Sequence, residues 1–216
     1  MTGCCDPRGC EDMFGHRFAA HQARRYRRRG LDATEQRIVD FLDSVGIEGA
    51  TILEIGGGAG QIQLELLRRG AASATNLELV DTYDTQAGQL ARQAGMSERM
   101  HRRIVDIAAT PDDVQPADVV VLHRVVCCYP DYERLLAAAA DRTKSLLVFS
   151  YPPRNPVSRA LVAAQNAFFK VSGKSFRTFA HPPDRMLDVL HQHGLVTTYT
   201  RTGRMWHVAG MRRQPA

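Results

Sequence analysis

The stretch Leu53–Gly70, which reads LEIGGGAGQIQLELLRRG, decides the fold of this chain. It begins as a short apolar strand, passes through a glycine-rich loop and continues as an amphipathic helix. Glycines have no side chain, so such a loop lets the backbone approach a charged, nucleotide-like ligand closely. The ligand of such a loop is a dinucleotide, a nucleoside triphosphate or something smaller, and the spacing of the loop distinguishes between them.

The spacing argues against the first two ligands. A phosphate-binding P-loop ends in Gly-Lys-Ser/Thr, and this loop contains no Lys. A dinucleotide fingerprint requires a glycine at the position where Gln61 stands. The loop instead has an acid before its glycines, in the order Glu54-x-Gly56-x-Gly58-x-Gly60. This order resembles the first motif of class I S-adenosylmethionine (SAM)-dependent methyltransferases, and the resemblance covers residues 35–212.

The resemblance implies that SAM is the cofactor and S-adenosylhomocysteine its product. It also implies roles for two acids that follow the loop. Glu78 ends the expected second strand, where such an acid accepts hydrogen bonds from both ribose hydroxyls. Asp106 ends the expected third strand, where the family usually places an acceptor for the adenine amino group. The cofactor-binding residues implied in this way are Glu54, Gly56, Gly57, Gly58, Gly60, Glu78, Asp106 and His123.

The rest of the chain alternates between strand and helix patterns. Apolar strands are expected over 51–55, 75–80, 103–107, 118–123 and 145–151, with helices over 61–67, 85–95 and 131–142. Nearly continuous apolar strands that alternate with helices indicate a buried parallel sheet with helices on both faces. The last two strands, 195–201 and 205–211, are separated by too short a turn for a helical crossover, so they should pair antiparallel. We therefore expect an α/β, Rossmann-like class I methyltransferase fold, with a seven-stranded, mostly parallel sheet and an antiparallel last strand.

Length and composition favour one domain of ordinary size, preceded by an arm. The 216 residues, of which 44% are hydrophobic, suffice for a single core. We expect a helical, Cys-bearing N-terminal arm, acting as a lid, over 1–33, and the methyltransferase domain over 34–216 with a lid-like insertion at 153–183. No stretch is long and apolar enough for a membrane span, and the N-terminus lacks the apolar region of a secretory signal. These features predict a cytoplasmic protein, either a monomer or a homodimer.

The charge is basic, with 28 Lys and Arg against 23 Asp and Glu, and the stretch ARRYRRRG at 23–30 concentrates it. A basic run with one aromatic residue can bind nucleic acid, or it can be the solvated face of a helix. DNA and RNA amino-methyltransferases have Asn/Asp-Pro-Pro-Tyr/Phe after the fourth strand, and this chain does not. Cytosine-carbon methyltransferases need a nucleophilic Cys after Pro, whereas Cys127 and Cys128 follow Val. A nucleic-acid substrate is therefore disfavoured, and a small-molecule acceptor is expected.

Two further segments bear on the acceptor. HRVVCCYP, 123–130, and FRTFAHPP, 176–183, together resemble the magnesium-protoporphyrin methyltransferase family, which esterifies a porphyrin propionate. The resemblance implies methylation of a carboxyl or hydroxyl oxygen. It departs at Cys128, because that family usually has a His directly before Tyr-Pro. The catalytic candidates are His123 at the fourth strand's end, Tyr129 after it, and His181 on a segment expected to cover the pocket.

The cysteines support a second hypothesis. Cys4, Cys5 and Cys10 lie in the arm and Cys127 and Cys128 at the fourth strand's end, so the arm could bring the thiols together. Such thiolates suit a soft acceptor or metal, such as trivalent arsenic, or a structural zinc. The arm spacing lacks the paired CxxC of a zinc site, and no residue is assigned as a metal ligand. Bystander thiols, and a non-catalytic SAM-binding protein, are the remaining alternatives.

Overall fold

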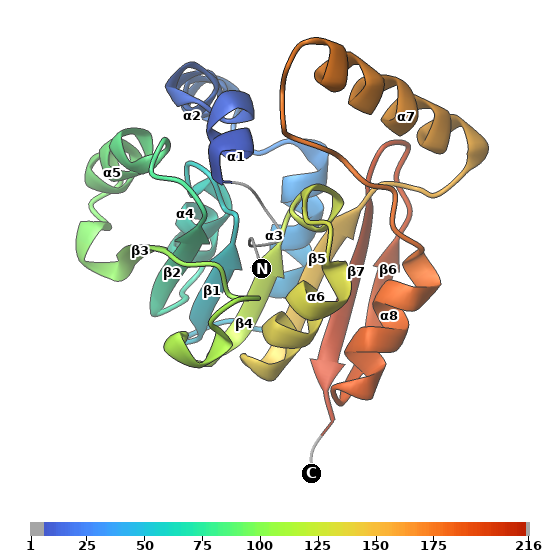
Figure 1. Ribbon diagram of the computed structural model, residues 1–216. Helices are drawn as coiled ribbons and strands as arrows, with labels where there is room; N and C mark the ends of the chain where they lie inside the picture. Colours follow the sequence, from blue (N-terminus) through green and yellow to red (C-terminus); the bar gives the residue numbers. More distant parts are fainter. Residues whose placement is uncertain (1–6, 215–216) are drawn as a thin grey trace.

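The computed structural model describes residues 7–214, and its centre is one seven-stranded sheet (Figure 1). The strand order is β3-β2-β1-β4-β5-β7-β6, and β7 is antiparallel to both of its neighbours. The strands are β1 Thr51–Ile55, β2 Ser73–Glu78, β3 Met100–Ile104, β4 Ala117–Leu122, β5 Thr143–Tyr151, β6 Leu195–Arg201 and β7 His207–Arg213. The parallel body and the antiparallel final pair are confirmed.

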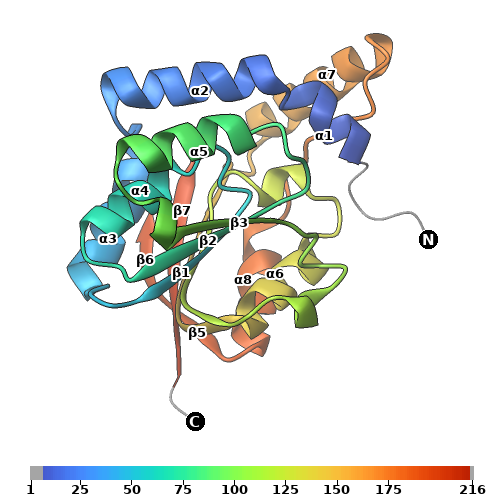
Figure 2. The same ribbon diagram turned by 90° about the vertical axis from the view of Figure 1, so that its left-hand side faces the viewer.

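Helices cover both faces of the sheet (Figure 2). On one face α3 (Ala33–Val45) and α4 (Gln61–Arg68) bury Ile38, Leu42 and Leu66 against the strands. On the other face α6 (Tyr132–Asp141) and α8 (Pro183–Gln192) bury Leu135 and Leu190. The helix α5 (Asp84–Gln93) packs beside α2 (His16–Arg29), and short 3-10 turns lie at η1 Ser97–Arg99, η2 Pro111–Asp113 and η3 Val126–Cys128. The expected layers of helix, sheet and helix are therefore present.

The bounds of several strands differ from those expected: β5 begins at Thr143 and β7 lies at His207–Arg213, and the shifts of β2 and β3 bear on the site. The second strand lies at Ser73–Glu78 and the third at Met100–Ile104, so both begin earlier in the chain than the apolar pattern predicts. The ladder between them ends with the pair Glu78 and Ile104. Ile107 is buried in the turn that follows, which explains why the sequence pattern extended the strand to it. Asp106 therefore lies in this turn and does not end the strand, which corrects that part of the prediction.

The arm consists of two helices, α1 (Pro7–Met13) and α2. Both lie above the carboxyl ends of the parallel strands, on the same side of the molecule as α7 (Pro156–Val171) (Figures 1 and 2). Within the basic run, Tyr26 is buried and donates a hydrogen bond of 2.6 Å to Glu65 of α4. Arg25 forms an ion pair of 3.1 Å with the buried Glu35. The basic run thus also anchors the arm to the core.

The junction between arm and core is a capped helix end. Asp32 accepts hydrogen bonds from the backbone N–H groups of Thr34 and Glu35, and Glu35 accepts one from the Asp32 N–H. This reciprocal capping box satisfies N–H groups that have no partner inside the helix. It fixes the direction in which the chain enters α3. No helix in the described part of the chain is long and apolar enough to span a bilayer.

Candidate cofactor and acceptor site

A pocket opens at the carboxyl ends of β1, β2 and β4 and is partly covered by the arm. The core contributes Glu54, Gly56, Gly57, Gly58, Glu78, Asp106, His123, Arg124, Cys128 and Tyr129 to its wall. The arm contributes Cys10, Phe14, Phe18 and Gln22. Ligands of open α/β sheets bind at this position, beyond the strand ends. The pocket is therefore lined by most of the residues that the sequence predicts to bind the cofactor or to act in catalysis.

The glycine loop leaves no room for side chains. A Cβ added at Gly57 would lie 2.4 Å from Glu54 Oε2 and 2.9 Å from Asn76 Oδ1. Gly58 has a φ of 58°, in the left-handed region that side chains disfavour. Gly60 caps α4 and is not among the residues that line the pocket. The glycines at 57 and 58 are thus required by contact and by backbone conformation.

Buried side chains of β2 hold the backbone of this loop, and a second buried acid, Glu54, lies against it. Glu78 Oε1 accepts a hydrogen bond of 2.6 Å from the Gly58 N–H, and Asn76 Oδ1 accepts one of 2.9 Å from Gly57. Glu54 is 1% exposed, and burial together with the nearby Glu78 raises its pKa to about 8. Burial also raises the pKa of Glu78. The pocket therefore holds acidic groups that a cationic or hydroxyl-bearing ligand would stabilise as carboxylates.

Asp106 and Tyr129 form a hydrogen-bonded pair in the wall of the pocket. The Tyr129 hydroxyl lies 3.0 Å from each carboxylate oxygen of Asp106 and donates to them. Asp106 Oδ1 also accepts from the Ala108 N–H, which fixes the turn after β3. A carboxylate has about four lone-pair positions, so Asp106 retains capacity for a ligand amino group. Tyr129 thus positions Asp106, a role that the sequence did not predict.

His123 lies directly after β4, and its side chain is 9% exposed. Its Nδ1 lies 3.0 Å from Ser150 Oγ, which also accepts a hydrogen bond from the Arg124 N–H. Burial, together with the nearby positive charge of Arg124, lowers the pKa of His123 to about 3. The imidazole is therefore neutral at physiological pH. Its Nε2 has no hydrogen-bond partner among the described residues.

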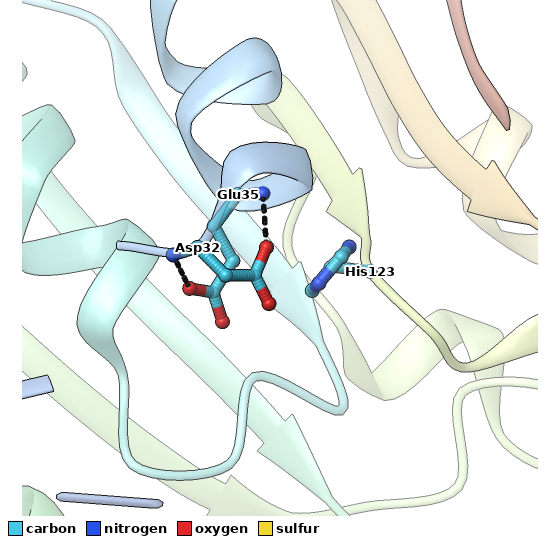
Figure 3. Close-up of side chains that lie close together, drawn as sticks. All are labelled: Asp32, Glu35 and His123. Carbon is cyan, nitrogen blue, oxygen red and sulfur yellow. Dashed lines mark hydrogen bonds between the residues drawn. The ribbon is translucent and has the colours of Figure 1, made fainter. Parts of the chain in front are cut away.

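The side chains of Asp32, Glu35 and His123 lie close together (Figure 3), and His123 is the one of the three that lines the pocket. One ligand-type atom from each lies within 4.8 Å of the others, an arrangement that resembles a metal site. Both carboxylates, however, are already paired with arginines. Arg124 binds Asp32 at 2.7 Å, and Arg25 binds Glu35 at 3.1 Å. Two guanidinium groups at this distance oppose a further cation, so the cluster is an ion-pair network between arm and core.

Arg124 is a pocket-lining member of this network that the sequence did not indicate. It is the one non-glycine residue with positive φ, 59°, in the described part of the chain. Such a conformation is unfavourable and persists where the surroundings hold it. Asp32, Ser150 and the Trp206 ring, 5.2 Å from the guanidinium, hold it here. Because these partners are far apart in sequence, no local pattern could have identified it.

His181 lies outside this pocket. Its Nε2 forms a hydrogen bond of 2.9 Å with the Tyr129 backbone oxygen, and its ring stacks on Phe179. Its ring also lies 4.3 Å from that of Tyr132 on α6. The structure therefore brings His123 and Tyr129 to the pocket and places His181 behind the wall, where it supports the backbone at Tyr129.

The pocket suits SAM in its chemistry. Its wall contains buried polar atoms that have no hydrogen-bond partner among the described residues: Gln22 Oε1, Glu54 Oε2, Gln61 Oε1, His123 Nε2 and Arg124 Nε. Apolar side chains such as Phe14, Val125 and Leu135 line the remainder. A ligand with a charged end, a ribose and an aromatic base would meet both kinds of surface.

The sheet order, the reversed β7 and the glycine loop after β1 define a class I SAM-dependent methyltransferase. A family model agrees with this class over most of the chain. The chain belongs to the methyltransferase domain family, whose model matches residues 19–200. No curated protein matches the sequence.

Solved structures share the fold at low identity. Magnesium protoporphyrin IX methyltransferase from Synechocystis PCC 6803, with bound SAH, has a TM-score of 0.72 and 16% identity, and the match covers 94% of this chain and 100% of that one. An O-methyltransferase family protein from Burkholderia thailandensis has a TM-score of 0.71 and 20% identity, and the match covers 95% of this chain and 61% of that one. An O-methyltransferase family 2 protein from Planctomyces limnophilus, in complex with apigenin, has a TM-score of 0.68 and 18% identity, and the match covers 91% of this chain and 62% of that one.

Proposed function

We propose that this methyltransferase methylates an oxygen of a small molecule, and that the acceptor oxygen belongs to a carboxylate. The observation that carries the proposal is the pair His123 and Arg124 on the acceptor side of the pocket. His123 is a weak base because its pKa is lowered to about 3. A phenol or alcohol needs a base to remove its proton, whereas a carboxylate is already ionised at neutral pH. The site therefore suits an acceptor that arrives deprotonated.

Arg124 supports the same acceptor. It lines the pocket, and its buried Nε has no partner among the described residues. A guanidinium binds carboxylates with charge-assisted hydrogen bonds. Arg124 would hold one carboxylate oxygen, and His123 would orient the other through its Nε2. Two of the similar solved structures are O-methyltransferase family proteins, and a third is a magnesium protoporphyrin IX methyltransferase, which agrees with an oxygen acceptor on a small molecule.

The cofactor would be held by the residues marked in the sequence. When bound, SAM supplies an electrophilic methyl group on a sulfonium. Glu78 would accept hydrogen bonds from the ribose hydroxyls and Asp106 from the adenine amino group, and Glu54 would interact with the cationic end of the ligand. The backbone of Gly56, Gly57 and Gly58 would line the ribose and methionine portions. Alignment of the acceptor oxygen with the methyl group is then the main task of the protein.

The arm, residues 1–33, and the insertion, 153–183, would act as lids. Cys10, Phe14, Phe18 and Gln22 of the arm already line the pocket. Phe169 and Phe176 of the insertion are buried against Cys10, so the two segments support each other over the opening. Closing both would exclude water from the transferring methyl group. A small-molecule acceptor of this kind is consistent with a cytoplasmic enzyme, and a monomer or a homodimer could carry this pocket.

The test combines SAM binding with identification of the product. Native mass spectrometry should show one SAM per chain, lost in Gly58→Val and weakened in Glu78→Gln. A panel of aromatic carboxylates, phenols and amines is then incubated with methyl-labelled SAM. A methyl ester releases volatile labelled methanol in alkali, whereas a methyl ether or amine does not. Methanol release from a carboxylate acceptor supports the proposal, and transfer to phenols alone contradicts it. SAM binding without transfer to any acceptor would indicate a non-catalytic SAM-binding protein.

A further inference from the structure

Cysteines from two distant parts of the chain lie at one end of the pocket. Cys10 comes from α1, and Cys127 and Cys128 come from η3 after β4. Cys10 and Cys128 both line the pocket, and Cys127 is buried directly behind Cys128. The fold therefore brings the arm and the fourth strand's end together, as the sequence led us to consider. Cys4 and Cys5 lie outside the described residues.

The adjacent pair has a geometry suited to sharing one ion. The Sγ atoms of Cys127 and Cys128 are 3.5 Å apart. Both also approach the same carbonyl oxygen, that of Arg124, at 3.6 Å and 3.7 Å. Successive side chains of a strand point to opposite faces, so neighbouring cysteines on β4 could not meet in this way. The 3-10 turn brings both sulfurs to one side of the backbone.

Cys10 faces the same region. It is 8% exposed and belongs to an apolar cluster with Val80, Phe169 and Phe176, against which Cys128 also packs. Cys10 and Cys128 thus share one apolar cluster in the wall of the pocket.

The surroundings select the kind of ligand. The described residues offer one group of three His, Cys, Asp or Glu ligand atoms within 4.8 Å, and it is the arginine-paired cluster of Asp32, Glu35 and His123. Around Cys127 and Cys128, in contrast, the ligand atoms that lie close together are sulfurs, and the neighbouring side chains are mostly apolar. Zinc prefers four tetrahedral ligands, whereas soft thiophilic ions accept two or three thiolates.

We propose that Cys127 and Cys128 form a dithiolate site for a soft ion of low coordination number, of the class of trivalent arsenic or Cu(I), and that Cys10 supplies a third thiolate when α1 closes. This goes beyond the proposed function, because binding of the ion requires neither SAM nor methyl transfer. Since Cys128 lines the acceptor side of the pocket, an ion held there would lie where the acceptor is expected to enter. It would also tie the arm to the end of β4.

The experiment uses the full chain, reduced and freed of metal, with two arsenical probes. Arsenite can bind three thiolates, whereas phenylarsine oxide binds two. Wild-type protein should retain one arsenic per chain with either probe, measured by native mass spectrometry. Cys127→Ser and Cys128→Ser should each weaken the binding of both probes at least tenfold. Cys10→Ser should weaken the binding of arsenite at least tenfold and leave that of phenylarsine oxide unchanged, because Cys127 and Cys128 remain intact.

The controls separate the site from a general loss of structure. Each variant must show the far-UV circular dichroism spectrum of the wild type and a cooperative urea transition, which shows that the chain is folded. Equal competition by Cu(I) supports a site for soft ions in general, and its absence identifies the metalloid as the ligand. Retention of arsenic in Cys127→Ser and Cys128→Ser would refute the proposal that these two cysteines form the site. Loss of arsenite binding in a Cys4→Ser/Cys5→Ser variant, with Cys10→Ser unaffected, would overturn the role of Cys10. Tight tetrahedral zinc binding would overturn the low coordination number.

Discussion

Replacing Gly57 by Ala tests the glycine loop with the smallest possible side chain. The new Cβ would lie 2.4 Å from Glu54 Oε2, 2.5 Å from Glu54 Cδ and 2.9 Å from Asn76 Oδ1. Both neighbours are at most 1% exposed, so neither can move aside into solvent, and the loop itself must shift. Overpacking of this kind costs about 1–3 kcal/mol. If the loop must return to its place to bind SAM, the dissociation constant should rise about 5- to 150-fold.

The assay is isothermal titration of SAM, together with urea denaturation of the ligand-free protein. Any part of the cost that the loop cannot relax away will appear as lost stability, so the two losses should together amount to about 1–3 kcal/mol. Gly88→Ala is the matched control, since Gly88 lies within α5 and its nearest neighbour is the flexible end of Arg92. That variant should gain up to about 1 kcal/mol in stability and bind SAM normally. A Gly57→Ala protein with normal stability and SAM affinity would refute the contact argument.

Three further predictions concern buried groups around the pocket. Because the pKa of Glu54 rises from 4.5 to about 8 on folding, the folded protein holds an extra proton between these values, so its free energy of unfolding should fall as pH rises through this range. Glu54→Gln should flatten that slope in urea denaturation. The pKa of His123 falls from 6.5 to about 3, so stability should fall as pH drops below 6.5, and the His123 ring should show neutral NMR shifts at a pH midway between these two values. Charged His123 at that pH would contradict its burial. Tyr129→Phe should cost about 1.5 kcal/mol in chemical denaturation by removing the donor to Asp106, and an unchanged midpoint would show that this hydrogen bond is replaced by water.

The parts of the site that are local in sequence could be predicted from it. The glycine loop and Glu78 follow from spacing along one strand, loop, helix and strand unit, and the structure places them in one pocket. Asp106 was assigned to the end of a strand because an apolar residue in a buried turn looks like an apolar residue in a strand. Arg124 and its partner Asp32 could not be predicted, because their ion pair depends on how the arm lies on the core. The approach of Cys10 to the pocket depended on the same docking and was only a hypothesis until the structure placed it.

Asp32 limits how this enzyme could be recombined with its relatives. The same carboxylate caps α3 and pairs with Arg124, which lines the pocket. A chimera joined after residue 33 that brought in an arm without an acid at 32 would lose the helix cap and the partner of Arg124 together. A chimera joined before residue 31 would keep both. The arm is therefore not an independent module for exchanging substrate preference, and its natural boundary for engineering lies at Gly30, where α2 ends.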